Sequence, residues 1–168
     1  MDANNTYFTR KSYSAMRADW LCIMFALLAA VVWFRQEINW LLFFVMFWYI
    51  DVIGTAPGLY LQWKNARAGR RNASVPNWAV AGYNICHSFV TQGIVIAVWY
   101  LISGFEWTML AMPLHLAADR GVFGNIYKNY NEAFEPPANP VFQAFLSQKE
   151  AGHFAPAADG SGATLPTA

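Results

Sequence analysis

Long runs of apolar residues constrain the fold of this chain more than any other feature. They cover approximately residues 20–34, 38–63, 78–102 and 107–128. A transmembrane helix needs about 20 mainly apolar residues, and short loops make successive helices antiparallel neighbours. Only 12% of the residues are charged, whereas a soluble domain carries about 25%. The sequence therefore predicts an all-α fold, a bundle of four transmembrane helices.

Composition divides the chain into three parts. Residues 1–16 are polar, residues 17–130 contain the four apolar runs, and residues 131–168 form a tail rich in Pro, Ala and Gly. Within the tail, residues 141–150 are compatible with a short interfacial helix, and the rest is expected to be flexible. The first apolar run could instead belong to a cleaved signal peptide, but it contains no good cleavage site.

Positive charge is concentrated in the loop from Lys64 to Asn77. This loop contains four basic residues and no acidic one. The positive-inside rule places such a loop in the cytoplasm, so four spans also put both termini there. The net charge of +1 gives no reason to expect a nucleic-acid partner.

Ionisable side chains lie inside the predicted spans. Asp51 is near the middle of the second run, His87 is in the third, and His115 and Asp119 are in the fourth. Such groups are costly in hydrocarbon unless they face a bundle interior, and they indicate a functional site. His115 and Asp119 are one helical turn apart. The helical rise of about 1.5 Å per residue puts all four at similar depths, so we expect them to converge as catalytic residues.

Polar neighbours of these four residues are the expected substrate-binding groups. Pro57 should kink the second span just beyond Asp51, because proline cannot donate a backbone hydrogen bond. Asp119 beside Arg120 also fits a structural ion pair at a helix end. The predicted substrate-binding residues are Thr55, Tyr83, Asn84 and Arg120.

Three motifs follow one another along the chain. They are Asp51 with a Gly/Pro-rich continuation, Tyr83-Asn84-x-x-His87, and His115-x-x-x-Asp119-Arg120 with a following glycine and Lys128. Over residues 17–130 this order resembles an uncharacterised family of small bacterial four-pass membrane proteins, a domain of unknown function. The chain departs from that pattern in residues 124–127, where the family has Gly-Leu-Lys-Tyr, and in its tail. The resemblance implies a bacterial inner (plasma) membrane protein but no reaction.

Three functions fit a buried Asp/His cluster. The first is a membrane enzyme that isomerises or cyclises a lipid-soluble substrate such as an isoprenoid, at a double bond or an epoxide, since burial keeps an aspartic acid protonated. The second is a non-catalytic accessory subunit or a proton-linked carrier. The third is a metal or haem protein in which His87 and His115 are ligands.

The enzyme hypothesis assigns no cofactor and no metal ligand. It contains no zinc-type Cys/His spacing and no nucleotide-binding motif. Bulky neighbours of both spanning histidines disfavour haem, and three histidines are too few for a membrane di-iron enzyme. Cys22 and Cys86 both lie in apolar runs and are not expected to form a disulfide. The expected partners are the lipid bilayer, a hydrophobic small-molecule substrate and a homo-oligomer or larger membrane complex.

Overall fold

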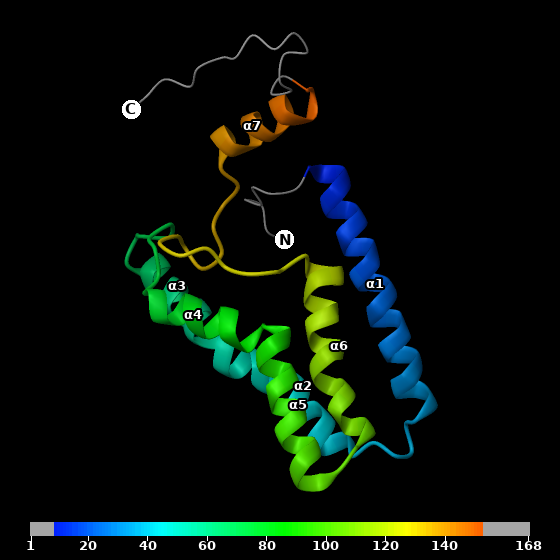
Figure 1. Cartoon of the computed structure of the whole chain (residues 1–168). Coiled ribbons are helices and arrows are strands. Elements are labelled where there is room, and N and C mark those ends of the chain that lie inside the picture. The colour runs from blue at the N-terminus through cyan, green and yellow to red at the C-terminus, as the bar shows by residue number, and fades with distance from the viewer. Residues whose placement is uncertain (1–8, 153–168) are drawn as a thin grey trace.

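The computed structural model describes residues 9–152, and all regular structure in that range is helical (Figure 1). A 3-10 turn, η1 (Trp107–Leu110), and a π turn, η2 (Asp119–Phe123), flank helix α6. The all-α prediction is confirmed. The helices are α1 (Arg10–Trp33), α2 (Trp40–Gly54), α3 (Ala56–Arg67), α4 (Asn77–Cys86), α5 (Phe89–Ser103), α6 (Ala111–Ala118) and α7 (Pro140–Glu150).

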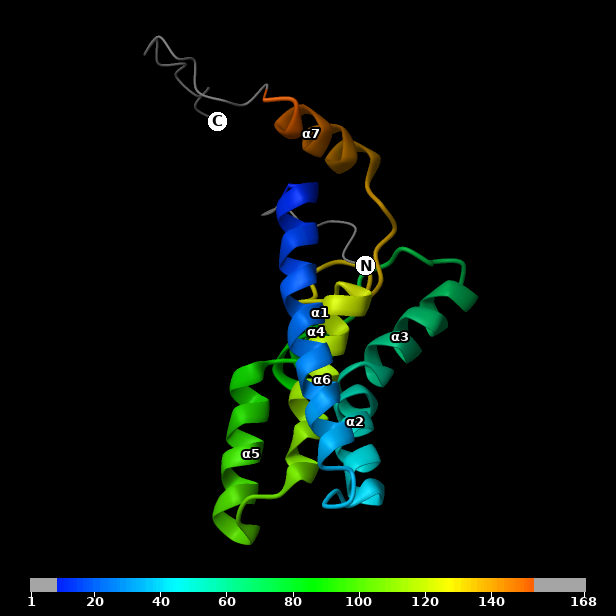
Figure 2. The ribbon, with the colours of Figure 1, turned by 90° about the vertical axis from the view of Figure 1, so that its right-hand side faces the viewer.

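Helix α6 is the central element. It packs against α1, α2 and α5, which surround it in both ribbon views (Figures 1 and 2). Its side chains at Met112 and Leu116 are completely buried. Met24 of α1 and Phe43 of α2 join Leu114 in one apolar core. The helix that carries His115 is therefore enclosed by its neighbours.

The second predicted span is bent where the sequence predicts a kink. Helices α2 and α3 meet at Thr55 with an angle of 42°. Pro57 lies in the first turn of α3, where its missing N–H leaves the carbonyl of Ile53 without the usual helical donor. The predicted kink just beyond Asp51 is confirmed.

The third predicted span is not one continuous helix. The chain breaks at His87 and Ser88, and α4 and α5 meet at 55°. Ser88 caps the first turn of α5 with its side chain. Gln92 Nε2 donates to the Cys86 carbonyl at 2.6 Å, and Arg120 Nη2 donates to the His87 carbonyl at 2.9 Å. Side chains therefore satisfy carbonyls that the break frees.

The fourth predicted span is also not a single long helix. Helix α6 has 8 residues, and the π turn after it ends at Gly124, whose φ of 72° favours glycine. In the described range, α1 alone is long and apolar enough to cross a membrane by itself. The pairs α2–α3 and α4–α5 also qualify if each bent pair is one span. The four-span topology and the location of the termini stay predictions.

The connecting loops gather at two ends of the helical body (Figure 1). At one end, the rings of Phe34 and Trp107 stack, and the Asn39 amide donates to Thr108 Oγ1 at 3.1 Å. At the other end, the segments 68–76 and 124–139 meet, for example through a hydrogen bond from the Val75 amide to the Glu132 carbonyl. This arrangement matches the antiparallel order expected from the short loops.

Large apolar side chains cover much of the outer surface of α1, α2 and α5. A contiguous apolar surface of this kind is unusual on a monomeric soluble protein and indicates contact with lipid or another apolar partner. Examples that are more than half exposed are Phe25, Trp33, Leu41, Trp48, Val52, Val90, Ile94 and Leu101.

The ends of the predicted domain differ from the composition boundaries. Helix α1 begins at Arg10, capped by Thr9, so part of the polar segment 1–16 is helical. Phe134 is buried against Gly58, so the packed region extends past residue 130. Helix α7 confirms a helix close to the predicted 141–150. The rest of the predicted flexible tail, residues 153–168, lies outside the described residues.

Gly121, in the π turn η2 that follows α6, tests the packing of this turn against α1. A Cβ at this position would lie 2.9 Å from the Leu21 backbone nitrogen. Gly121→Ala should therefore lower the free energy of unfolding by about 1–3 kcal/mol, the usual cost of overpacking. Gly93→Ala, where a Cβ meets no atom within 4 Å, is the matched control and should be neutral or stabilising by about 0.5–1 kcal/mol. Thermal unfolding in detergent measures both, and equal midpoints would contradict this packing.

Candidate functional site

The structure brings the four predicted catalytic residues together. Asp51 comes from α2, His87 from the break after α4, His115 from α6 and Asp119 from the start of η2. His87 and His115 are 1% and 3% exposed and Asp119 is 8% exposed, while the Asp51 side chain is 33% exposed. Three segments of the chain that are far apart in sequence therefore form one cluster, in which Asp51 alone is partly exposed.

The two imidazoles lie between the two carboxylates. His87 Nε2 is 3.4 Å from Asp51 Oδ1 and 3.3 Å from Asp119 Oδ2. His115 Nε2 is 3.8 Å from Asp51 Oδ2 and 3.5 Å from Asp119 Oδ2. A charge-assisted N–H···O hydrogen bond is normally about 2.7–2.9 Å long. The four groups thus converge without forming such bonds.

The ring orientation of His87 is fixed by its own helix. Its Nδ1 lies 3.0 Å from the Tyr83 carbonyl. Since a carbonyl oxygen only accepts, Nδ1 carries the proton, and the neutral ring has its lone pair on Nε2. The Tyr83 ring stacks on the imidazole at 3.9 Å between centroids. These contacts aim Nε2 of His87 at both carboxylates.

His115 and Asp119 carry buried polar atoms that lack hydrogen bonds within the described part of the chain. They are both ring nitrogens of His115 and Oδ2 of Asp119. The Phe47 ring packs edge-on against His115, with centroids 4.9 Å apart. A buried polar group without a partner costs about 1–3 kcal/mol, so these atoms indicate a ligand or reaction site rather than a structural network.

Gly54 allows α2 to approach the break after α4. A Cβ at Gly54 would lie 2.9 Å from Cys86 Cβ and 3.1 Å from two atoms of the His87 ring. Only a residue without a side chain fits here while Asp51, one turn earlier, reaches His87. Thr55 also borders the cluster, because its hydroxyl donates to Asp51 Oδ1 at 2.7 Å.

Arg120 stabilises the backbone next to the cluster. Its guanidinium donates to the backbone carbonyls of His87 and Leu116. The rings of Trp20 and Phe89 lie 5.3 and 4.8 Å from the guanidinium carbon. In the described range these contacts, rather than an ion pair with its neighbour in sequence, account for the buried charge. Arg120 therefore positions His87 and does not point at the cluster.

Asn84 also binds backbone instead of facing the cluster. Its side-chain amide donates to the Lys128 carbonyl at 3.0 Å, and its oxygen accepts from the Lys128 amide at 2.7 Å. This two-way contact fastens the segment after η2 to α4. The sequence places Asn84 and His87 on one helical face. Because the helix breaks at His87, the two side chains point in different directions.

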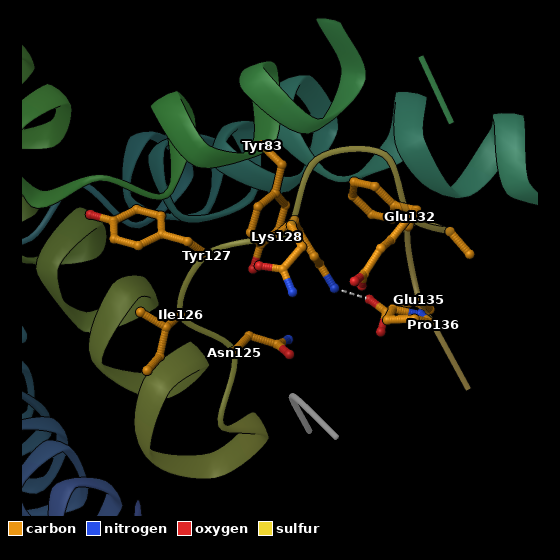
Figure 3. Close-up of a pocket in the computed structure, with 11 residues that line it drawn as sticks. Tyr83, Asn125, Ile126, Tyr127, Lys128, Glu132, Glu135 and Pro136 are labelled. Carbon is orange, nitrogen blue, oxygen red and sulfur yellow. Dashed lines mark hydrogen bonds and ion pairs between the residues drawn. The ribbon is translucent and has the colours of Figure 1, made fainter. Parts of the chain in front are cut away.

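A small cavity lies beside Tyr83. Figure 3 shows the Tyr83 side chain extending from α4 toward Lys128, whose ammonium group pairs with Glu135. Glu132 also lines this cavity, which has a volume of about 20 Å³. That is room for roughly one water molecule, so the cavity is too small for a substrate.

Sequence reasoning missed the residues that shape the cluster. Gly54 permits the close approach, Phe47 packs on His115, and Gln92 caps the break while accepting a hydrogen bond from Tyr49. Ser88 was the only local sequence signal of the break between α4 and α5, since serine is a preferred helix N-cap.

Searches of protein-family models, of curated proteins and of solved structures found no match for this chain. The resemblance noted from the motifs therefore stays a prediction.

Asn84→Ala tests the anchoring role. The change leaves the amide and carbonyl of Lys128 without their partners, at a cost of about 1–3 kcal/mol of local stability. Trypsin cleavage after Lys128 should accelerate roughly 5- to 150-fold, because cleavage follows local opening. Asn129→Ala, at an exposed neighbouring position, is the matched control. Equal cleavage rates in the two variants would return Asn84 to the list of substrate-binding candidates.

Proposed function

We propose that this chain is a four-pass membrane enzyme that performs acid/base chemistry on a lipid-soluble substrate, with Asp119 as the group that moves the proton. The reaction class is isomerisation or cyclisation at a double bond or an epoxide, for example of an isoprenoid. Both reactions rearrange one substrate and need no second reactant, so a cluster of acids and bases is sufficient for them.

The observation that carries this proposal is the environment of Asp119. Its Oδ2 is buried, makes no hydrogen bond to the described residues and lies 3.3 and 3.5 Å from two imidazole nitrogens. A structural carboxylate at such a depth is normally satisfied by hydrogen bonds. An unsatisfied one beside basic nitrogens is suited to exchanging a proton with a bound molecule.

The approach to the cluster favours an apolar substrate. Asp51 is its most accessible member, with 33% of its side chain exposed. On α2, Trp48 and Val52 flank Asp51 and are 56% and 64% exposed. A molecule that reaches the carboxylates past these residues crosses an apolar surface, and in a bilayer that surface faces lipid.

Site-directed labelling tests the proposed topology. In a background with Cys22 and Cys86 replaced by serine, Asn72→Cys and Ser103→Cys each introduce one exposed cysteine. We expect a membrane-impermeant maleimide to label Ser103→Cys in intact cells and Asn72→Cys only after permeabilisation. If only Asn72→Cys is labelled from outside, the predicted orientation is wrong. If both cysteines are labelled from outside, the four-span topology is wrong.

Asp119→Asn tests the chemistry. The change preserves shape but removes the titratable proton, which typically lowers an acid/base rate about 100-fold or more. Membrane lipid extracts from cells that overproduce the wild type should show one lipid depleted and an isomer of equal mass accumulated. Extracts from Asp119→Asn cells should not.

Asp19→Asn is the matched control for this experiment, because it makes the same replacement at an exposed position of α1. It should behave as the wild type. Identical lipid profiles for the wild type and Asp119→Asn, at equal amounts of folded protein, would contradict the enzyme proposal and favour an accessory subunit or carrier.

A further inference from the structure

We infer that Asp51, His87 and His115 bind a divalent transition-metal ion, with Asp119 beside it as a separate proton-transfer group. This inference deepens the proposed function, because it names the cofactor of the same site. It develops the alternative from the sequence in which His87 and His115 are metal ligands, and it adds Asp51 as the third ligand.

The three ligand atoms have the spacing that a metal ion requires. One ligand atom from each of Asp51, His87 and His115 lies within 4.8 Å of the other two. The closest approaches of the carboxylate to the imidazole nitrogens are 3.4 and 3.8 Å. Two atoms bound to the same tetrahedral zinc at about 2.0–2.2 Å are about 3.3–3.6 Å apart. The separation of 3.4 Å from Asp51 Oδ1 to His87 Nε2 lies inside this range, and the separation of 3.8 Å from Asp51 Oδ2 to His115 Nε2 lies slightly above it.

Ion pairing between protonated histidines and the carboxylates is the alternative explanation, and it fits less well. Protonated imidazoles would draw the carboxylate oxygens to about 2.7–2.9 Å. All four nitrogen–oxygen separations are instead 3.3–3.8 Å. His115 and Asp119 also retain buried atoms without hydrogen bonds in the described part of the structure. A central cation would satisfy His115 Nε2, which the ion pairs leave unsatisfied.

The orientation of His87 is that of a metal ligand. Histidine ligands almost always donate their second ring nitrogen to a carbonyl or carboxylate, which fixes the tautomer. His87 does this through Nδ1 and the Tyr83 carbonyl at 3.0 Å. Thr55 holds Asp51 in a similar way by donating to Oδ1. Two of the three ligands are therefore already oriented by outer partners.

The donor set indicates the class of metal. Two imidazoles and one carboxylate suit zinc, iron or another first-row transition metal, whereas magnesium and calcium prefer oxygen ligands alone. Together, Asp51 and Asp119 neutralise a dication, and a neutral site is the least costly one to enclose among apolar helices.

Asp119 lies at least as close to the two imidazoles as Asp51 does, with its Oδ2 3.3 Å from His87 Nε2 and 3.5 Å from His115 Nε2. We assign it the proton-transfer role because it is outside the three-residue ligand set. Catalytic zinc sites commonly have three protein ligands and keep one position open for water or substrate. A carboxylate next to that position can take up or release a proton. This division of roles agrees with Asp119 as the proposed acid/base.

Metal binding to the purified full-length chain tests the inference. The protein is stripped with a chelator, loaded with Zn²⁺ alone, and separated from free metal by gel filtration. We expect about one Zn²⁺ per chain and a higher thermal midpoint. Asp51→Asn, His87→Ala and His115→Ala should each weaken Zn²⁺ binding by more than the roughly 10- to 100-fold that the loss of an outer partner costs.

Two controls make the result specific. Asp119→Asn should retain Zn²⁺ while it loses the lipid change, and His153→Ala removes the chain's third histidine, which lies outside the described residues. Unchanged stoichiometry in the three ligand variants would overturn the inference. So would the absence of tightly bound Zn²⁺ in the wild type, a readout that needs no variant to fold.

The metal inference and the proposed function can fail separately. If chelator-treated, metal-free protein still converts the lipid, the function stands and the role of the metal as its cofactor falls. If Zn²⁺ binds at one per chain through Asp51, His87 and His115, but the wild type and Asp119→Asn give the same lipid profile, the metal centre stands and the enzyme proposal falls.

Discussion

The enclosure among apolar helices of four ionisable side chains, three of them buried and one partly exposed, is the constraint on which the rest of this structure depends. An isolated charge in a low-dielectric interior is disfavoured by several kcal/mol or more. Asp51, His87, His115 and Asp119 offset this cost only by lying together. Their convergence in turn fixes how α2, α4 and α6 must pack.

Breaks in the helices make that convergence geometrically feasible. The break after Cys86 turns the His87 ring toward Asp51, and Gln92 and Arg120 satisfy the carbonyls it frees. Because Gly54 has no side chain, α2 can then approach Cys86 and His87 to contact distance. Irregular backbone is tolerated inside a membrane protein where other parts of the protein satisfy it, and it commonly occurs near functional sites. The same pattern surrounds this cluster.

The sequence predicts the cluster better than its surroundings, for physical reasons. Asp51 and His115 stand out because ionisable residues are rare in apolar runs, and the spacing of His115 and Asp119 follows from the helical period. Pro57 predicts its kink through its own missing donor. The roles of Arg120 and Asn84 depend on carbonyls and amides brought close by tertiary packing, which no local pattern encodes. The same holds for the short length of α6 and for the break at His87.

The central claim is that one point in the structure is shared by two imidazoles and the Asp51 carboxylate. X-ray absorption spectroscopy of the Zn²⁺-loaded wild-type protein measures that most directly. The account predicts two imidazole nitrogens and at least one carboxylate oxygen at about 2.0–2.2 Å from the metal. A coordination sphere with no imidazole, or one with sulfur from Cys86, would contradict it.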